Sequence, residues 1–146
     1  VPTATSTREI PVKVLEENRH AINRHQQGLY LPKVSFTHLI AWAMVQAVQK
    51  VPAMAGVYVE QDGKSFRKLS SALNVGIAVD LPGKPGPNGE VRRSLVVPNV
   101  KDAGALDFAA FFAAYNQQID KARKGKLGPD DFADTTFTLT NPGTIG

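Results

Sequence analysis

Three histidines are the side chains of this sequence best suited to acid–base chemistry near neutral pH. His20 and His25 are five residues apart on one expected helix, about 140° apart around its axis, so they cannot bind one metal ion as an i, i+4 pair does. Polar helix positions of this kind usually face solvent. His38 falls in the first turn of a strongly apolar helix, where a core or capping role is favoured over catalysis.

The acidic residues and glycines form no metal, acid–base or phosphate-binding motif. Asp130 and Asp131 follow a proline, a pattern typical of a turn or helix start rather than of paired catalytic carboxylates. The glycines of one Pro/Gly-rich stretch precede a strand instead of a helix, which favours a hairpin loop over a phosphate cradle; they are Gly83, Gly86 and Gly89. The absence of cysteine excludes a disulfide scaffold, a Cys-ligated zinc site and a thiol nucleophile.

The basic residues give the chain a formal charge of +4 and gather mainly after one expected helix. They could attract a polyanion such as a nucleotide-bearing cofactor, or they could form a solvated face that complements the helix dipole. Aromatic residues do not alternate with them as base-stacking platforms would, so a nucleic-acid partner is not expected. The cluster comprises Lys121, Arg123, Lys124 and Lys126, with Arg92, Arg93 and Lys101.

Three helices are predicted from apolar residues at three- and four-residue spacing. The first begins at Pro11 and ends at Gly28. The second covers residues 35–50, with Ser35 or Thr37 as N-cap, and its wide apolar face predicts a largely buried helix. The third has Asp107 as N-cap, a basic last turn and Gly125 just beyond its end.

Strands are predicted where β-branched residues or a two-residue alternation prevail. Asp62-Gly63 supplies the positive φ angles of a tight hairpin turn, and a Pro/Gly-rich loop joins a second hairpin. The small residues alternating with the apolar ones in residues 73–81 suggest a strand covered on both faces. The expected strands cover residues 3–10, at a sheet edge, 57–60, 65–69, 73–81, 91–97 and 135–140.

The length of 146 residues and these elements predict one α+β domain with a mixed sheet. The last strand ends six residues before the C-terminus, so we expect a domain that is incomplete at its C-terminal end. The longest apolar run, Phe108 to Tyr115, is far shorter than a membrane span, and no signal-peptide pattern opens the chain. We therefore expect a soluble, cytoplasmic protein without a membrane partner.

Four segments, in order, resemble the catalytic domain of the dihydrolipoamide acyltransferases of 2-oxo-acid dehydrogenase complexes. They are VPTATSTREIPVKVLEENR, KVSFTHLIAWAMVQAVQKVP, NVGIAVDLP with SLVVPNVKDA, and ARKGKLGPDDFADTTFTLTNPGTIG. The closing LTNPGTIG looks most like the succinyltransferase-like domain fused to actinobacterial 2-oxoglutarate dehydrogenase/decarboxylase.

The resemblance implies a chloramphenicol-acetyltransferase-like fold, with a mixed sheet, helices on one side, and active sites between the subunits of a homotrimer or larger assembly. It implies acyl transfer, here of succinyl, from dihydrolipoyl-lysine to coenzyme A, alongside a lipoyl domain and a dehydrogenase component. A fused dehydrogenase domain would bring thiamine diphosphate and magnesium. The residues 137–140 match the family's FTxS/T motif, so Thr140 is the implied donor to the oxyanion.

The general base of the family is a histidine in a DHRxxxG-type motif, which this chain lacks. None of His20, His25 and His38 has that context, so the base is expected beyond Gly146. The family's first helix, before VPTAT, is also absent, so residues 1–146 resemble the central part of a catalytic domain and the isolated chain is expected to be inactive. The usual Asn after the helix-ending Pro52 is missing too.

Two hypotheses about function follow. In the first, the chain belongs to an acyltransferase within a larger multifunctional polypeptide. In the second, it serves mainly as a trimerising scaffold of a thiamine-dependent 2-oxoglutarate dehydrogenase/decarboxylase, with weak or no transfer. A strand residue such as Thr140 could equally be present for its β propensity, and Asn141 and Gly143 for a turn.

Overall fold

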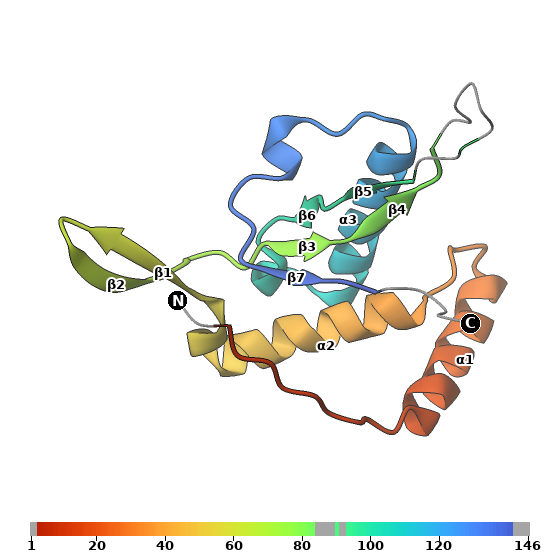
Figure 1. Cartoon of the computed structure of the whole chain (residues 1–146). Helices are drawn as coiled ribbons and strands as arrows, with labels where there is room; N and C mark the ends of the chain where they lie inside the picture. The colour runs from red at the N-terminus through yellow and green to blue at the C-terminus, as the bar shows by residue number, and fades with distance from the viewer. Residues whose placement is uncertain (1–2, 84–89, 91–92, 142–146) are drawn as a thin grey trace.

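The computed structural model describes residues 3–83, 90 and 93–141, and it confirms an α+β fold (Figure 1). Its helices are α1 (Lys13–Gly28), α2 (Phe36–Lys50) and α3 (Phe108–Arg123), with short 3₁₀ turns η1 (Pro52–Ala55), η2 (Ala103–Ala105) and η3 (Pro129–Asp131). Its strands are β1 (Gly56–Gln61), β2 (Lys64–Leu69), β3 (Val75–Ile77), β4 (Val79–Leu81), β5 (Ser94–Val96), β6 (Asn99–Val100) and β7 (Phe137–Leu139).

The central sheet has the order β6-β3-β7 and is mixed, as predicted, because β3 is antiparallel to β6 and parallel to β7. Val75 and Ile77 pack into the core that α2 and α3 complete. Gly76 faces the opposite side, where an added Cβ would lie 2.7 Å from Thr138 Oγ1 and 2.9 Å from Thr135 Cγ2. The helices therefore cover one face of β3, and the chain leading into β7 covers the other.

Helix α3 supplies the largest buried side chains of the core and begins and ends where the sequence predicts. The Asp107 carboxylate accepts a hydrogen bond from the Ala110 N–H at 2.7 Å. Gly125 adopts φ 63°, a conformation that glycine tolerates without strain. Between these ends, Phe111 and Tyr115 point into the core against α2 and the sheet.

Helix α2 is less buried than its sequence predicts. Its buried residues are His38, Ala41, Val45 and Val48, which form one narrow stripe. Ile40 is 41% exposed, while Trp42 and Met44 are half-buried. The expectation of a largely buried helix is wrong for this chain because α3, η2 and the sheet cover only one side of α2.

Replacing Leu39 or Met44 by Ala is consequently expected to cost less than the ~2 to 5 kcal/mol of a fully buried Leu or Met. Both side chains are half-buried, so water can enter part of the space that each truncation leaves. Urea denaturation of the chain would measure the losses, with Ile40→Ala, on the exposed side of α2, as the smallest of the three. A loss above ~2 kcal/mol for both residues would contradict this placement.

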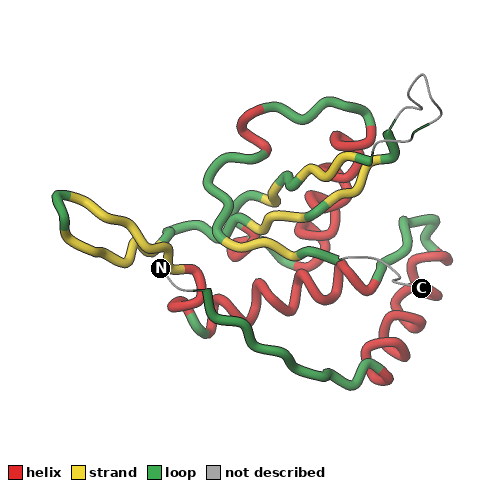
Figure 2. The backbone as a smooth tube through the Cα atoms, viewed as in Figure 1, coloured by secondary structure: helices red, strands yellow, loops and turns green. Residues whose placement is uncertain are grey.

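The β1–β2 hairpin projects from the body of the molecule, as Figure 2 shows. Asp62 and Gly63 have φ angles of 53° and 68°, which confirms the predicted turn. The hairpin leaves apolar side chains in solvent, with Tyr58 52% and Phe66 49% exposed. Strands β4 and β5 form the second predicted hairpin, although the loop residues 84–89, with Gly86 and Gly89, lie outside the described residues.

Residues 3–10 do not form the predicted edge strand. They run as an exposed, extended segment in a loop conformation (Figure 2). Their β-branched side chains favour extended backbone angles, but a strand also needs a neighbouring strand for its hydrogen bonds. Within the described part of the chain, the strands pair only with one another, and none of them pairs with residues 3–10.

Candidate functional site

Thr140 lies immediately beyond β7, at the end of the central sheet. The strand is fixed by its parallel register with β3, in which Ile77 is opposite Leu139. The Leu139 carbonyl also accepts a hydrogen bond from the Ala78 N–H at 3.2 Å. Thr140 itself is exposed, and its hydroxyl has no hydrogen-bond partner among the residues that the structure describes. An exposed threonine at the end of a fixed strand is accessible to an incoming group.

The residue after Thr140 connects this strand end to the start of α2. Asn141 Nδ2 donates a hydrogen bond to Thr37 Oγ1 at 3.1 Å, across 104 residues of sequence. In Figure 1 the end of β7 reaches the first turn of α2. Residues 142–146, with the predicted turn at Gly143, lie outside the described residues.

The first turn of α2 is stabilised by a reciprocal cap. The Ser35 hydroxyl accepts from the His38 N–H at 3.3 Å, and the Ser35 N–H donates to His38 Nδ1 at 2.9 Å. The N-cap prediction for Ser35 is thus confirmed. Histidine takes the place that Glu or Gln usually has in a capping box.

His38 has the core and capping role that its sequence context favours. It is 6% exposed, and its ring centroid lies 4.7 Å from that of Phe112 and 4.3 Å from that of Tyr115. Nδ1 accepts a hydrogen bond, so the neutral ring carries its proton on Nε2. Burial lowers the pKa of His38, while the Asn116 side chain acts in the opposite direction. A neutral, enclosed ring of this kind supports the helix.

His20 and His25 are exposed on α1, as expected. Over the described ranges, no group of three His, Cys, Asp or Glu side chains could hold a metal ion. The three histidines therefore remain apart, two in solvent and one in the core.

Two adjoining hollows lie beside α3, and one of them is lined by Phe112, whose ring packs against His38 of α2. One is an apolar pocket of about 380 Å³, lined by Gln26, Leu31, Pro32, Phe108, Ala109, Phe112, Ala113 and Asn116. The other is a basic hollow of about 600 Å³, to which Lys121, Arg123, Lys124 and Lys126 contribute. Pro32, Ala113 and Asn116 line both. An apolar surface thus continues into a positively charged one.

Within the described part of the chain, only four residues of the predicted basic cluster line one hollow: Lys121, Arg123, Lys124 and Lys126. Lys101 donates to the Ala133 carbonyl at 2.6 Å, and Arg93 forms an ion pair with Asp80. Arg92 lies outside the described residues. Within the basic hollow, Lys121 and Lys124 form ion pairs with Asp131 and Asp120, at 2.7 and 3.0 Å. Some of these cations thus pair with groups of the protein and others line a hollow, and attraction of a polyanion stays a prediction.

Asp131 is a capping residue, which confirms the turn predicted at Asp130-Asp131. Its carboxylate accepts hydrogen bonds from Lys121 Nζ at 2.7 Å, from the Gly128 N–H at 2.9 Å and from Gln118 Nε2 at 3.2 Å. The bond from Lys121 is the largest cause that lowers the pKa of Asp131 from 3.8 to about 2. The carboxylate fastens η3 to α3.

The depressed pKa of Asp131 predicts a loss of stability in acid. Because the folded state favours the charged carboxylate, its contribution is complete above the unfolded pKa of 3.8 and disappears as the pH falls to about 2. Asp131→Asn should flatten the pH dependence of the unfolding free energy in this window. Denaturation at several pH values would measure it, with the exposed neighbour Asp130 changed to Asn as control. An unchanged slope in Asp131→Asn would disprove this role.

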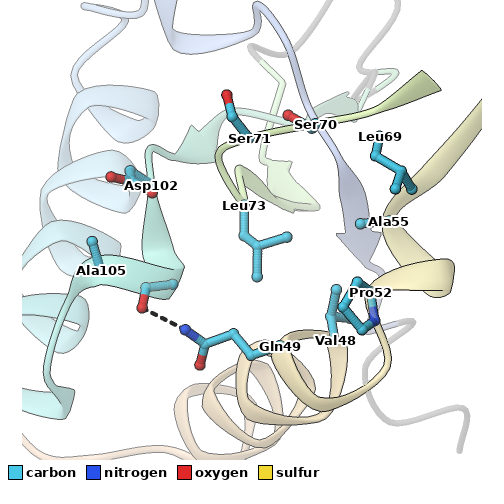
Figure 3. A pocket seen from close by; sticks show the side chains of 11 residues that line it. Val48, Gln49, Pro52, Ala55, Leu69, Ser70, Ser71, Leu73, Asp102 and Ala105 are labelled. Carbon is cyan, nitrogen blue, oxygen red and sulfur yellow. Dashed lines mark hydrogen bonds between the residues drawn. The ribbon is translucent and has the colours of Figure 1, made fainter.

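A third cavity, of about 530 Å³, lies near the opposite end of α2 (Figure 3). Gln49 reaches across it and donates from Nε2 to the Gly104 carbonyl at 2.6 Å. Val48, Pro52 and Leu73 form apolar walls, and Asp102 lies on the side of η2. Thr140 does not line this cavity.

Sequence reasoning did not find Thr37 as a contact of the strand end, nor the hollows beside α3. The sequence indicates Thr37 only as an alternative N-cap of α2. The hollows combine residues from the end of α1, the segment after it and α3, which local patterns cannot bring together. No helix in the described part of the chain has the length and apolar character needed to cross a membrane.

Comparison with known proteins agrees with these observations. Over all 146 residues the chain is 48% identical to the Multifunctional 2-oxoglutarate metabolism enzyme of Mycolicibacterium vanbaalenii and 47% identical to that of Mycobacterium sp. strain JLS. It spans only 11% of the length of these relatives.

Solved structures show the same fold. The truncated catalytic core of the 2-oxoacid dehydrogenase multienzyme complex from Thermoplasma acidophilum is 27% identical, with a TM-score of 0.69 over 92% of this chain and 55% of that one. Dihydrolipoamide acetyltransferase from Azotobacter vinelandii is 24% identical, with a TM-score of 0.70 over 92% of this chain and 50% of that one. The family model of the 2-oxoacid dehydrogenases acyltransferase catalytic domain matches residues 1–146, so the chain belongs to this acyltransferase family.

Proposed function

We propose that this chain takes part in succinyl transfer from dihydrolipoyl-lysine to coenzyme A, within a larger polypeptide of 2-oxoglutarate metabolism. Membership of the acyltransferase family and 47–48% identity to multifunctional 2-oxoglutarate enzymes support the reaction and its setting. In this proposal residues 1–146 are the central part of a catalytic domain with a chloramphenicol-acetyltransferase-like fold. The family's N-terminal helix and histidine motif would be supplied by other parts of the polypeptide.

The observation that carries the proposal is the exposed Thr140 at the end of β7, whose hydroxyl has no hydrogen-bond partner among the residues that the structure describes. In the proposed reaction, a histidine outside this chain removes the proton from the coenzyme A thiol, and the thiolate attacks the thioester carbonyl. Thr140 then donates a hydrogen bond to the oxyanion. When the tetrahedral intermediate collapses, the carbon–sulfur bond to dihydrolipoyl breaks, and its thiolate takes up the proton.

The hollows beside α3 are suitable for a long ligand with an apolar arm and a phosphorylated end. Coenzyme A has this character, so we assign its phosphates to the basic hollow and its less polar portion to the adjoining apolar pocket. Lipoyl-lysine, in its succinyl-dihydrolipoyl form, is the other substrate. Thiamine diphosphate and magnesium belong to a fused dehydrogenase component in this proposal, which the similarity to multifunctional 2-oxoglutarate enzymes supports.

Assembly into a homotrimer or larger oligomer is part of the proposal, together with a lipoyl domain, a dehydrogenase partner and a cytoplasmic location. Exposed apolar side chains on the β1–β2 hairpin and on the segment before α1 support an oligomer; they include Ile10, Val57, Tyr58 and Phe66. The same observation favours the second candidate function, a scaffold that trimerises a 2-oxoglutarate dehydrogenase/decarboxylase with weak or no transfer.

A transfer assay on the full-length polypeptide separates the two candidates. With succinyl-dihydrolipoamide and coenzyme A, an acyltransferase should form succinyl-coenzyme A at a rate that depends on enzyme concentration. The isolated 146-residue chain should be inactive, since it lacks the histidine motif. If the full-length oligomer shows no transfer, the scaffold role is favoured. Turnover by the isolated chain would overturn the assignment of the base to another segment.

A further inference from the structure

We propose that Thr37 is a positioning residue for Thr140, an inference that rests on the proposed acyl transfer. Thr37 is far from Thr140 in sequence and does not need to touch the reacting atoms. Its hydroxyl holds the residue next to Thr140. The proposal assigns the first turn of α2 a role in catalysis.

Two tethers flank Thr140, one on each side along the chain. Before it, the Leu139 carbonyl accepts from the Ala78 N–H at 3.2 Å. After it, Asn141 Nδ2 donates to Thr37 Oγ1 at 3.1 Å. Neither tether uses the Thr140 hydroxyl. The backbone at Thr140 is therefore restrained while the hydroxyl stays available to a developing negative charge.

The second tether ends on the first turn of α2, which is capped and packed against α3. Thr37 lies between Ser35 and His38, whose side chains cap the first turn of α2 reciprocally. The His38 ring packs edge-on against Phe112 and Tyr115 of α3, so this turn is fastened to the core. A displacement of Thr37 would require this packing and the cap to change. Asn141 is thus held by a hydrogen bond to helix α2, and Leu139 is held by a hydrogen bond to the segment that follows β3.

Loss of the tether should affect turnover more than substrate binding. An oxyanion donor acts only when charge develops on the carbonyl oxygen, so its misplacement raises the barrier without weakening the ground-state complex. Small misplacements of catalytic groups can cost about 10²-fold. For Thr37→Val, which keeps the shape of the side chain and removes the hydroxyl, we expect a fall in kcat of roughly 10- to 100-fold.

The experiment uses the full-length polypeptide and measures kcat and KM for succinyl transfer. Thr37→Val should lower kcat with KM for both substrates within about twofold, and Thr37→Ser, which retains the hydroxyl, should restore most of the rate. Thr7→Val is the matched control, since Thr7 is exposed in the segment before α1. Asn141→Ala removes the donor of this hydrogen bond together with the other contacts of Asn141, so it should lower kcat at least as much as Thr37→Val.

A double-mutant cycle tests whether Thr37 acts through Thr140. In a Thr140→Val background the donor is already gone, so adding Thr37→Val should cost little more. A full additional loss there would overturn the proposal, as would an unchanged kcat in folded Thr37→Val. If Thr37→Val fails to fold, the same cycle with Asn141→Ala decides. An inactive wild-type protein would instead refute the proposed acyl transfer itself, so the two failures are distinct.

Discussion

Replacement of Thr140 by Val is expected to reduce kcat of the full-length enzyme by ~10²-fold or more, about 2.7 kcal/mol or above in barrier height. The substitution retains a β-branched side chain and removes only the hydrogen-bond donor. Because Thr140 is exposed and its hydroxyl has no partner in the described part of the chain, loss of the hydroxyl should leave folding unaffected. Steady-state kinetics with a thermal melt would establish both results.

Thr140→Ser is the matched variant, since it keeps the hydroxyl and should retain much of the rate. KM should change little in either variant, because the proposed hydrogen bond forms in the transition state. A folded, oligomeric Thr140→Val enzyme whose kcat remained within a factor of two or three would eliminate the oxyanion role. Thr140 would then be an ordinary residue at the end of a strand.

The largest effect on stability is expected at Phe111. Its side chain is completely buried, and its ring centroid lies 5.4 Å from that of Trp42 on α2 and 6.1 Å from that of Tyr115. Phe111→Ala removes a ring from the junction of α2, α3 and the sheet, which should cost ~3 to 5 kcal/mol. This is a large part of the ~5 to 15 kcal/mol by which a typical domain is stable.

Urea denaturation would measure this loss, with Phe132→Ala as the control. Phe132 is 41% exposed, so its truncation should cost clearly less than that of Phe111. If Phe111→Ala does not fold, Phe111→Leu keeps part of the apolar volume and should show a smaller loss at the same position. Equal losses at Phe111 and Phe132 would contradict the assignment of the core.

Local signals in the sequence predict most of the elements. Asp107 and Gly125 mark the ends of α3, Ser35 marks the start of α2, and Asp62-Gly63 marks the hairpin turn. Each of these features depends on residues within one turn of each other, so a short stretch of sequence contains the whole interaction. The mixed sheet also follows, because the order of helices and strands limits how the strands can pair.

The predictions that fail depend on contacts between distant segments. Residues 3–10 have the composition of a strand but no neighbouring strand, and the apolar outer side of α2 lies beyond the reach of α3. For the site, the resemblance to acyltransferases indicates Thr140, but its tether to Thr37 spans 104 residues and has no local signature. A distant hydrogen bond of this kind can be found only in the folded chain.

The parallel pairing of β7 with β3 also affects how the protein folds. The contacts that fix β7 are non-local: the Asn74 N–H donates to Thr136 Oγ1, for example, across 62 residues. Closing loops of this length has an entropic cost that must be met before the pairing stabilises the chain, so such contacts form slowly. Thr140 follows directly after β7. We therefore expect its position to be established late in folding, so that partly folded chains lack the proposed oxyanion donor.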